Sequence, residues 1–297
     1  MSRMVTHFAA LGHRRLLVIA CLVLATSCSK AADTAMDRLP SMDAQAPGVV
    51  HVHGLGINPK DGALFAATHT GLFRIAEGKA VRVSNRYPDL MGFTVVGPDH
   101  FLASGHPDLR DYRAGTLPPL LGLIESTDGG QTWRPVSLLG QADFHVLQVA
   151  HGFIYGYDST SSRLMVSLTG ASWEQRATVA LRDVVVHPAQ AELVFGLTEQ
   201  GLRRSQDGGR TWQPAAAPPL LLLAWPQPEQ LWGLAADGVV FRSADAGETW
   251  QRHGQLPGTP AALLVAGSPL YAAIHQGGIY QSRDDGVSWQ LLYRDPS

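Results

Sequence analysis

The part of the sequence that we expect to fold has no cysteine, because Cys21 and Cys28 both fall within the first 28 residues. Disulfide bonds and cysteine-ligated metal ions are therefore excluded from it. A strong charge of either sign is also missing. The 23 Lys and Arg residues against 25 Asp and Glu give a net charge of −2 at pH 7, which provides no basic surface for nucleic acid.

Long apolar runs are scarce beyond the N-terminal segment. Runs such as Leu220–Trp225 are short, whereas a transmembrane helix needs roughly 20 apolar residues. The N-terminal run, Leu16–Leu24, is also too short; it follows basic residues and precedes Ala25-Thr26-Ser27-Cys28. A basic start, a short apolar stretch and a small-residue exit are typical of a secretory signal. The sequence therefore predicts export rather than a membrane span.

The small residues before Cys28 resemble a bacterial lipobox, although Ala25 occupies the position where that motif prefers Leu. This resemblance predicts a lipoprotein-type signal peptide over residues 1–28, with Cys28 as the lipid attachment site. Such an anchor is stable because it carries more than one acyl chain. We expect the protein in the cell envelope, on the periplasmic side of the outer membrane, with the membrane as a partner through the lipid. The alternative is an ordinary signal cut near Ser27, which would give a soluble periplasmic or secreted protein.

Residues 29–47 are small, polar and patternless, which predicts a flexible tether. Residues 48–297 are enough for one large all-β domain.

Within them an octet recurs with Ser first, Asp third and Trp last, and its four aspartates are Asp128, Asp207, Asp245 and Asp284. A shorter relic, Ser167–Trp173, lacks the aspartate. The resulting five tryptophans stand 38 to 40 residues apart, at 133, 173, 212, 250 and 289.

A fixed period near 40 residues with strand and turn signals is typical of propeller blades. The octet resembles the Asp-box of bacterial sialidases, sortilin-type receptors and photosystem II assembly factors. We therefore predict an all-β fold, a single β-propeller of about six four-stranded blades with Asp-box hairpins. The expected blades are 50–84, 91–136, 143–177, 181–214, 219–253 and 261–293. In the octet the Asp accepts backbone hydrogen bonds, the later Gly adopts φ > 0, and the Trp is buried between blades. An insertion, Pro107–Leu120, is expected to lie over one mouth of the channel.

Aligning the repeats places several polar residues at one mouth of the channel, opposite the Asp-boxes. The starts of first strands and the ends of second strands meet on the same face of an antiparallel blade. Imidazoles with carboxylates suit zinc or copper. We therefore predict a divalent transition-metal site, of the zinc or copper class, formed by His51, His53, His69, His106 and His145. Further ligand contacts are expected from Asp158, Glu199 and Arg182. The alternative is that His51 and His53 pack in the channel wall and the other histidines are exposed loop residues.

Several segments resemble a family of bacterial exported Asp-box propellers that are often lipoproteins: His51–Leu55, Ala67–Leu72, Met91–Thr94, Ala103–Pro107 and Asp143–His145. This likeness covers nearly all of the mature chain. The family is commonly labelled glycosyl-hydrolase-like, but the label rests on the Asp-box and implies no activity.

A sialidase-like exo-glycosidase is the alternative function. Sialidases bind a substrate carboxylate with three arginines, whereas Arg182 is the one arginine that we place at the mouth. Phe73-Arg74-Ile75-Ala76 resembles their Phe-Arg-Ile-Pro signature but ends in Ala. Asp158 and Glu199 would serve as the acid/base pair. Because no clear catalytic constellation is present, the leading prediction is a binding or assembly module. Its expected partner is an envelope protein, or a small ligand or glycan, at the channel mouth.

Overall fold

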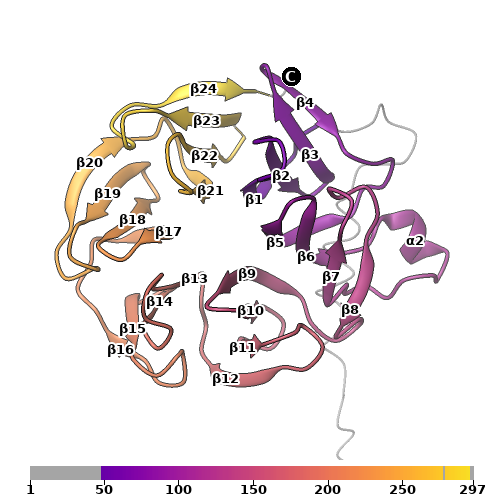
Figure 1. The fold of residues 1–297 in the computed structure, drawn as a ribbon, viewed down its shortest axis with the longest axis horizontal. Helices are drawn as coiled ribbons and strands as arrows, with labels where there is room; N and C mark the ends of the chain where they lie inside the picture. Colours follow the sequence, from indigo (N-terminus) through magenta and orange to yellow (C-terminus); the bar gives the residue numbers. More distant parts are fainter. Residues whose placement is uncertain (1–47, 277, 295–297) are drawn as a thin grey trace, which may run out of the picture. The chain divides into compact units, whose positions relative to one another are not determined.

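The computed structural model describes residues 48–276 and 278–294. The signal peptide predicted over residues 1–28, the lipid attachment site Cys28 and the tether over residues 29–47 lie outside these residues. The described chain forms six four-stranded sheets arranged as the blades of one ring (Figure 1). The prediction of an all-β propeller with six blades is confirmed. No helix among the described residues is long and apolar enough to cross a membrane.

Every blade consists of four strands that are consecutive in the sequence. Blade one contains β1 (Val52–Ile57), β2 (Leu64–Thr68), β3 (Gly71–Ala76) and β4 (Lys79–Arg82). Blade two contains β5 (Asp89–Gly97), β6 (His100–His106), β7 (Leu123–Ser126) and β8 (Arg134–Ser137). Blade three contains β9 (Phe144–Ala150), β10 (Phe153–Asp158), β11 (Arg163–Ser167) and β12 (Glu174–Thr178).

The second half of the ring repeats this arrangement. Blade four contains β13 (Asp183–Val186), β14 (Val194–Thr198), β15 (Gly201–Ser205) and β16 (Gln213–Pro214). Blade five contains β17 (Leu220–Gln227), β18 (Gln230–Ala235), β19 (Val239–Ser243) and β20 (Gln251–Gln255). Blade six contains β21 (Pro260–Leu264), β22 (Leu270–Ile274), β23 (Gly278–Ser282) and β24 (Gln290–Tyr293).

The ring closes by side-chain packing between the first and last blades. Val52 and Leu55 of β1 belong to one buried apolar cluster with Ala262 of β21 and Ile279 of β23. No strand is shared across this junction, because both blades are built from consecutive strands. The hydrophobic effect therefore supplies the closure.

Each complete Asp-box is held by the same hydrogen bonds. In the box of blade four, the buried Ser205 hydroxyl donates to Asp207 Oδ1 at 2.7 Å and accepts from the Gly209 amide at 2.8 Å. Asp207 also accepts from the Thr211 amide at 2.8 Å and from the Thr211 hydroxyl at 2.6 Å. Gly209 has φ of 90°, a left-handed value that favours glycine. The sequence predicted the roles of Asp and Gly but not the serine hydroxyl at the centre of the turn.

The Asp-box tryptophans are half-buried rather than fully enclosed. The Trp212 ring lies over Gly196 of β14, so close that a Cβ on Gly196 would be only 3.0 Å from it. The Trp212 indole N–H donates to the Gly209 carbonyl at 3.1 Å. The tryptophan thus connects its own turn to the second strand of its own blade.

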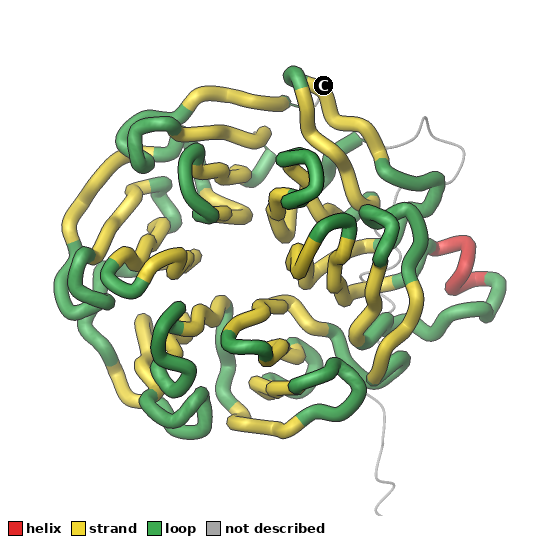
Figure 2. Tube along the Cα trace, viewed as in Figure 1, coloured by secondary structure: helices red, strands yellow, loops and turns green. Residues whose placement is uncertain are grey.

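The insertion in blade two contains the short helix α2 (Leu109–Arg113), which lies at the outer edge of the ring (Figures 1 and 2). The prediction that this insertion covers a channel mouth is wrong. Asp108, which is buried, accepts hydrogen bonds from the Arg110 amide and from the Tyr87 amide, both at 2.8 Å. These bonds hold the insertion against the link between blades one and two, outside the channel.

Candidate functional site

Strand direction defines two faces of the ring. The starts of the first strands and the ends of the second strands lie at one end, which we call the histidine face. The β3–β4 type of hairpin, which carries the Asp-boxes, lies at the other end, which we call the Asp-box face. His53, His69, His106 and His145 all belong to the histidine face.

The first strand of most blades carries a β-bulge at this face. In blade one, Val52 pairs with Thr68 and Gly54 with Ala67, so that His53 is the extra residue. In blade three, Phe144 pairs with Asp158 and Val146 with Tyr157, which makes His145 the extra residue. Met91 of blade two, Leu221 of blade five and Ala261 of blade six are extra residues in the same place. A bulge re-aims its side chain, and both bulged histidines line the central cavity of about 420 Å³.

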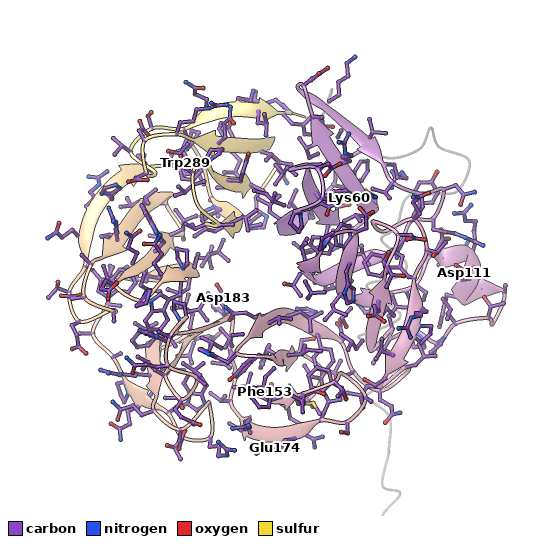
Figure 3. All side chains as sticks on the ribbon, viewed as in Figure 1. Lys60, Asp111, Phe153, Glu174, Asp183 and Trp289 are labelled. Atoms are coloured by element: carbon purple, nitrogen blue, oxygen red, sulfur yellow. The ribbon has the colours of Figure 1, made fainter. Side chains whose placement is uncertain are left out.

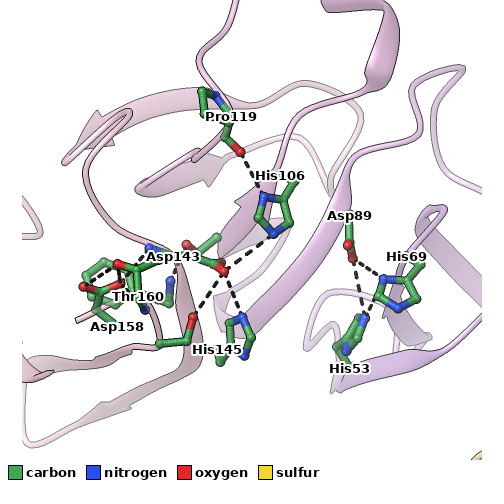
Figure 4. A network of polar contacts seen from close by, with 12 residues as sticks. His53, His69, Asp89, His106, Pro119, Asp143, His145, Asp158 and Thr160 are labelled. Atoms are coloured by element: carbon green, nitrogen blue, oxygen red, sulfur yellow. Dashed lines mark hydrogen bonds and ion pairs between the residues drawn. The ribbon is translucent and has the colours of Figure 1, made fainter. Parts of the chain in front are cut away.

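The bulge at His53 brings it against His69 and Asp89, forming what we call the inner cluster (Figure 4). His53 Nε2 lies 3.1 Å from His69 Nδ1 and 3.5 Å from Asp89 Oδ1. His69 Nδ1 lies 2.8 Å from Asp89 Oδ1. Asp89 is the first residue of β5 and comes from the neighbouring blade, so the cluster spans blades one and two.

Burial and neighbouring charge shift the pKa values of the inner cluster in opposite directions. Burial alone would raise the pKa of Asp89, but the two imidazoles beside it hold that pKa well below its usual range. Desolvation lowers the pKa of His53, and this effect outweighs the neighbouring carboxylate. An ionised carboxylate beside a neutral imidazole is the protonation state that metal ligands require.

The three donor atoms converge in a way that suits a metal ion. Ligands bonded at 2.0–2.1 Å to a tetrahedral ion lie about 3.3 Å apart, and the observed separations of 2.8, 3.1 and 3.5 Å bracket that value. Asp89 Oδ1 is buried and has no well-aligned hydrogen bond, so it retains capacity to bind. Among residues 48–276 and 278–294, these three form the one group whose ligand atoms all lie within 4.8 Å of one another.

A second group, which we call the outer-blade cluster, lies between blades two and three. It contains His106, His145 and the buried Asp143 (Figure 4). Asp143 Oδ2 is 2.9 Å from His145 Nε2 and 3.6 Å from His106 Nε2. The other ring nitrogen of His106, Nδ1, donates to the Pro119 carbonyl at 2.9 Å, which fixes the ring. The three donors are farther apart than in the inner cluster.

The carboxylates predicted as ligand contacts lie elsewhere. Asp158 is buried and accepts hydrogen bonds from the Asp143 amide at 2.9 Å and the Thr160 hydroxyl at 2.9 Å, with a further bond from Ser161. Its oxygens are thus occupied by hydrogen bonds from its own turn and from the residue before β9. Arg182 and Glu199 form an exposed ion pair of 3.4 Å on blade four. Arg182 lines the channel cavity, but neither residue joins the histidines.

A further carboxylate, Asp183, lies at the central opening (Figure 3). Desolvation raises its pKa to about 7. One oxygen accepts from the Leu223 amide at 2.7 Å and the other from the Val184 amide at 2.8 Å. Asp183 therefore connects the first strands of blades four and five, and we assign it a structural role.

Sequence reasoning missed Asp89 and Asp143, the two carboxylates at the centres of the clusters. Each stands at the start of the first strand of its blade, and Asp143 lies two residues before His145. This shared position was the available signal. The contacts themselves depend on how neighbouring blades pack, which spacing along one chain does not give.

Comparisons with known proteins agree with this fold. Residues 124–135 match the BNR/Asp-box repeat. No curated protein matches the chain significantly. The GH74 xyloglucanase of Xanthomonas campestris is similar in structure, with a TM-score of 0.51, 19% identity and coverage of 84% of this chain and 38% of the enzyme. An ancestral GH74 enzyme gives a TM-score of 0.52 at 14% identity, over 85% of this chain and 40% of that one.

A YCF48 structure bound to a D1 peptide is about equally similar, with a TM-score of 0.51 and 15% identity over 85% of this chain and 86% of that one. This chain thus spans about two fifths of the GH74 enzymes and most of YCF48. The similar structures include both glycoside hydrolases and a peptide-bound propeller, and at these identities they show the fold alone. Together with the repeated turns, they show that the chain is a six-bladed β-propeller with BNR/Asp-box repeats.

Proposed function

We propose that this chain is a binding module of the cell envelope that holds a divalent transition-metal ion, of the zinc or copper class, at its histidine face. The ligands are His53, His69 and Asp89. The observation that carries this proposal is the convergence of three donor atoms within 3.5 Å, around a buried carboxylate oxygen that lacks an aligned hydrogen bond. Two imidazoles and one carboxylate are a common ligand set for these metals.

The position of the inner cluster beside the central cavity would let a metal ion there bind an external group. His53, a member of the inner cluster, also lines the central cavity, which has a volume of about 420 Å³. Three protein ligands leave a fourth tetrahedral position, which an external group would fill. We infer that a small ligand or glycan, or a side chain of an envelope protein, occupies that position.

Hydrolysis of a glycoside by Asp158 and Glu199 has less support. The Asp158 carboxylate is occupied by hydrogen bonds from Asp143 and Thr160, and Glu199 is exposed in an ion pair with Arg182. A general acid needs a carboxyl group that is free to face the substrate. These two residues therefore give no basis for a glycosidase mechanism.

The metal proposal is tested by titrating zinc into protein purified without a metal-affinity tag. Asp89→Asn should weaken zinc binding at the inner cluster by at least about 100-fold, because an amide replaces an anionic ligand. Asp143→Asn is the matched control, since Asp143 is also buried beside two histidines but its donors do not converge. It should change that affinity by less than about tenfold. Equal effects of the two variants, or no loss in Asp89→Asn, would refute the proposed ligand set.

The location is a separate proposal. Cys28→Ser should move the protein from the membrane fraction to the soluble periplasmic fraction without altering its melting temperature, because Cys28 precedes the propeller. Retention of this variant on membranes after a high-salt wash would contradict lipid attachment at Cys28.

A further inference from the structure

His275 occupies the position in blade six that His69 occupies in blade one. His69 directly follows β2 (Leu64–Thr68), and His275 directly follows β22 (Leu270–Ile274). The His69 amide donates to the Val50 carbonyl at 3.1 Å, and the His275 amide donates to the Thr259 carbonyl at 2.9 Å, in both cases just before the first strand. The sequence alignment of the repeats left His275 out, but the structure places it in register on the histidine face.

His275 lies beside His51 across the junction between the last and first blades. Their ring centres are 5.1 Å apart, and the centre of the His51 ring is 5.0 Å from that of His69. The side chains of His51 and His275 are both exposed. The imidazoles therefore extend from an exposed pair at the junction, through His69, to the buried Asp89.

The backbone at His51 is left-handed, as it is at eight other non-glycine residues among those described. His51 has φ of 49°, in the left-handed region that few residues other than glycine adopt. It directly precedes β1, and the bulge at His53 follows within the strand. Because of these two irregularities, the rings of His51 and His53 lie 6.2 Å apart at an interplanar angle of 25°.

The separation of the exposed pair matches shared metal ligation. A ring centre lies about 3.2 Å from an ion bound to one of its nitrogens at 2.0–2.1 Å. Two imidazoles on one tetrahedral ion therefore have centres about 5 Å apart. The value for His51 and His275 is 5.1 Å. Their exposure leaves both rings free to turn their nitrogens toward a common ion, with water completing its coordination.

We infer that His51 and His275 form a second transition-metal site, which joins blade one to blade six when an ion is bound. This inference deepens the proposed function of the histidine face, but its residues are separate from the ligands of the inner cluster. Among the described residues, the two blades share no strand, and an apolar cluster packs across the junction. An ion held by one residue from each side would therefore add a direct link between the two ends of the ring.

The inference is tested by zinc titration calorimetry and thermal unfolding on the wild type, three variants and one control variant. Wild-type protein should bind two zinc ions, and His275→Ala should bind one. Asp89→Asn should retain the ion at the exposed pair. In the Asp89→Asn background, zinc at about 100 times its dissociation constant should raise the melting temperature by about 5–10 °C. Adding His275→Ala to Asp89→Asn should abolish that rise.

The control is His100→Ala, which removes a half-exposed imidazole paired with Glu125 at the other end of β6. This variant should keep both zinc ions. An unchanged stoichiometry in His275→Ala would overturn the second site, as would loss of all zinc binding in Asp89→Asn. Loss of one ion in His275→Ala together with normal binding in Asp89→Asn would support the second site but refute the inner cluster. The two proposals thus fail separately.

Discussion

The two faces of this propeller differ in how closely their contacts repeat from blade to blade. On the Asp-box face, four turns repeat one set of contacts, and the Ser-to-Asp hydrogen bond is 2.7 Å in every one of them. On the histidine face, an equivalent position carries histidine in some blades, as at His69 and His275, and other residues in the rest. Even the two clusters that share the composition of two histidines and one buried aspartate differ in geometry.

This difference suggests different roles for the two faces, stability for the Asp-box face and binding for the histidine face. A contact that recurs in four blades, each time within one turn, serves the folding of those blades. The Asp-box carboxylates accept several hydrogen bonds inside their own turns and have little capacity left for a ligand. Asp89, by contrast, is buried without an aligned hydrogen bond at Oδ1. We therefore expect changes on one face to affect unfolding and changes on the other to affect binding.

The largest effect expected on the Asp-box face is that of Trp212→Ala. The ring is half-buried over Gly196 and its N–H is hydrogen bonded, so its loss should reduce the free energy of unfolding by about 2–3 kcal/mol. This is less than the 3–5 kcal/mol typical of a fully buried aromatic residue. Urea unfolding measures the loss, and zinc titration of the folded variant should give the wild-type affinity. A lower zinc affinity would show that the two faces are coupled.

A smaller effect is expected from acid. Hydrogen bonds from Thr249 lower the pKa of Asp245 to about 2, and those from Ser288 lower that of Asp284 to about 2, from an ordinary value of 3.8. Because the folded-state pKa values are lowered, their stabilisation is complete above about pH 4 and is lost as pH falls toward 2.

Melting temperatures measured between pH 5 and pH 2 should therefore fall steeply in this range. Asp245→Asn combined with Asp284→Asn should have a lower melting temperature at pH 5 and a shallower decline toward pH 2. A decline as steep as that of the wild type would show that other groups cause the acid sensitivity.

The smallest effect is expected from Glu199→Gln, although Glu199 lies on the histidine face. Its ion pair with Arg182 is exposed to solvent, and such pairs contribute little. The free energy of unfolding should change by less than about 0.5 kcal/mol, and zinc affinity should stay the same. A clear loss of zinc affinity would place Glu199 in the site and weaken the distinction drawn between it and Asp89.

The fold could be predicted from the sequence because its signals are local and repeated. The tryptophan at each turn fixed the blade register, and the observed blade that ends with β16 at Pro214 matches the predicted end at residue 214. The insertion Pro107–Leu120 was placed wrongly, because its position depends on the bonds of Asp108 to a neighbouring linker.

The candidate site could be predicted only in part. The alignment of the repeats and the strand direction placed His53, His69, His106 and His145 on one face, but they gave no distances between blades. Asp89 contacts His69 across the junction between blades one and two, and His275 contacts His51 across the junction between blades six and one. Each of these distances depends on the packing of two sheets. A bulge also shifts which side chains point inward, and the strand pattern gives no sign of the bulge at His53.

The closure of the ring without a shared strand has a consequence for how such a chain can change. Each blade is one uninterrupted segment of sequence. A genetic duplication of one repeat would therefore add a whole sheet, and a deletion would remove one, without interrupting any other sheet. For the same reason, the two chain ends could be joined and new ends opened in the link between β12 and β13, giving a permuted chain with every sheet intact. The order of blades in the gene is then one of six circular permutations that give the same ring.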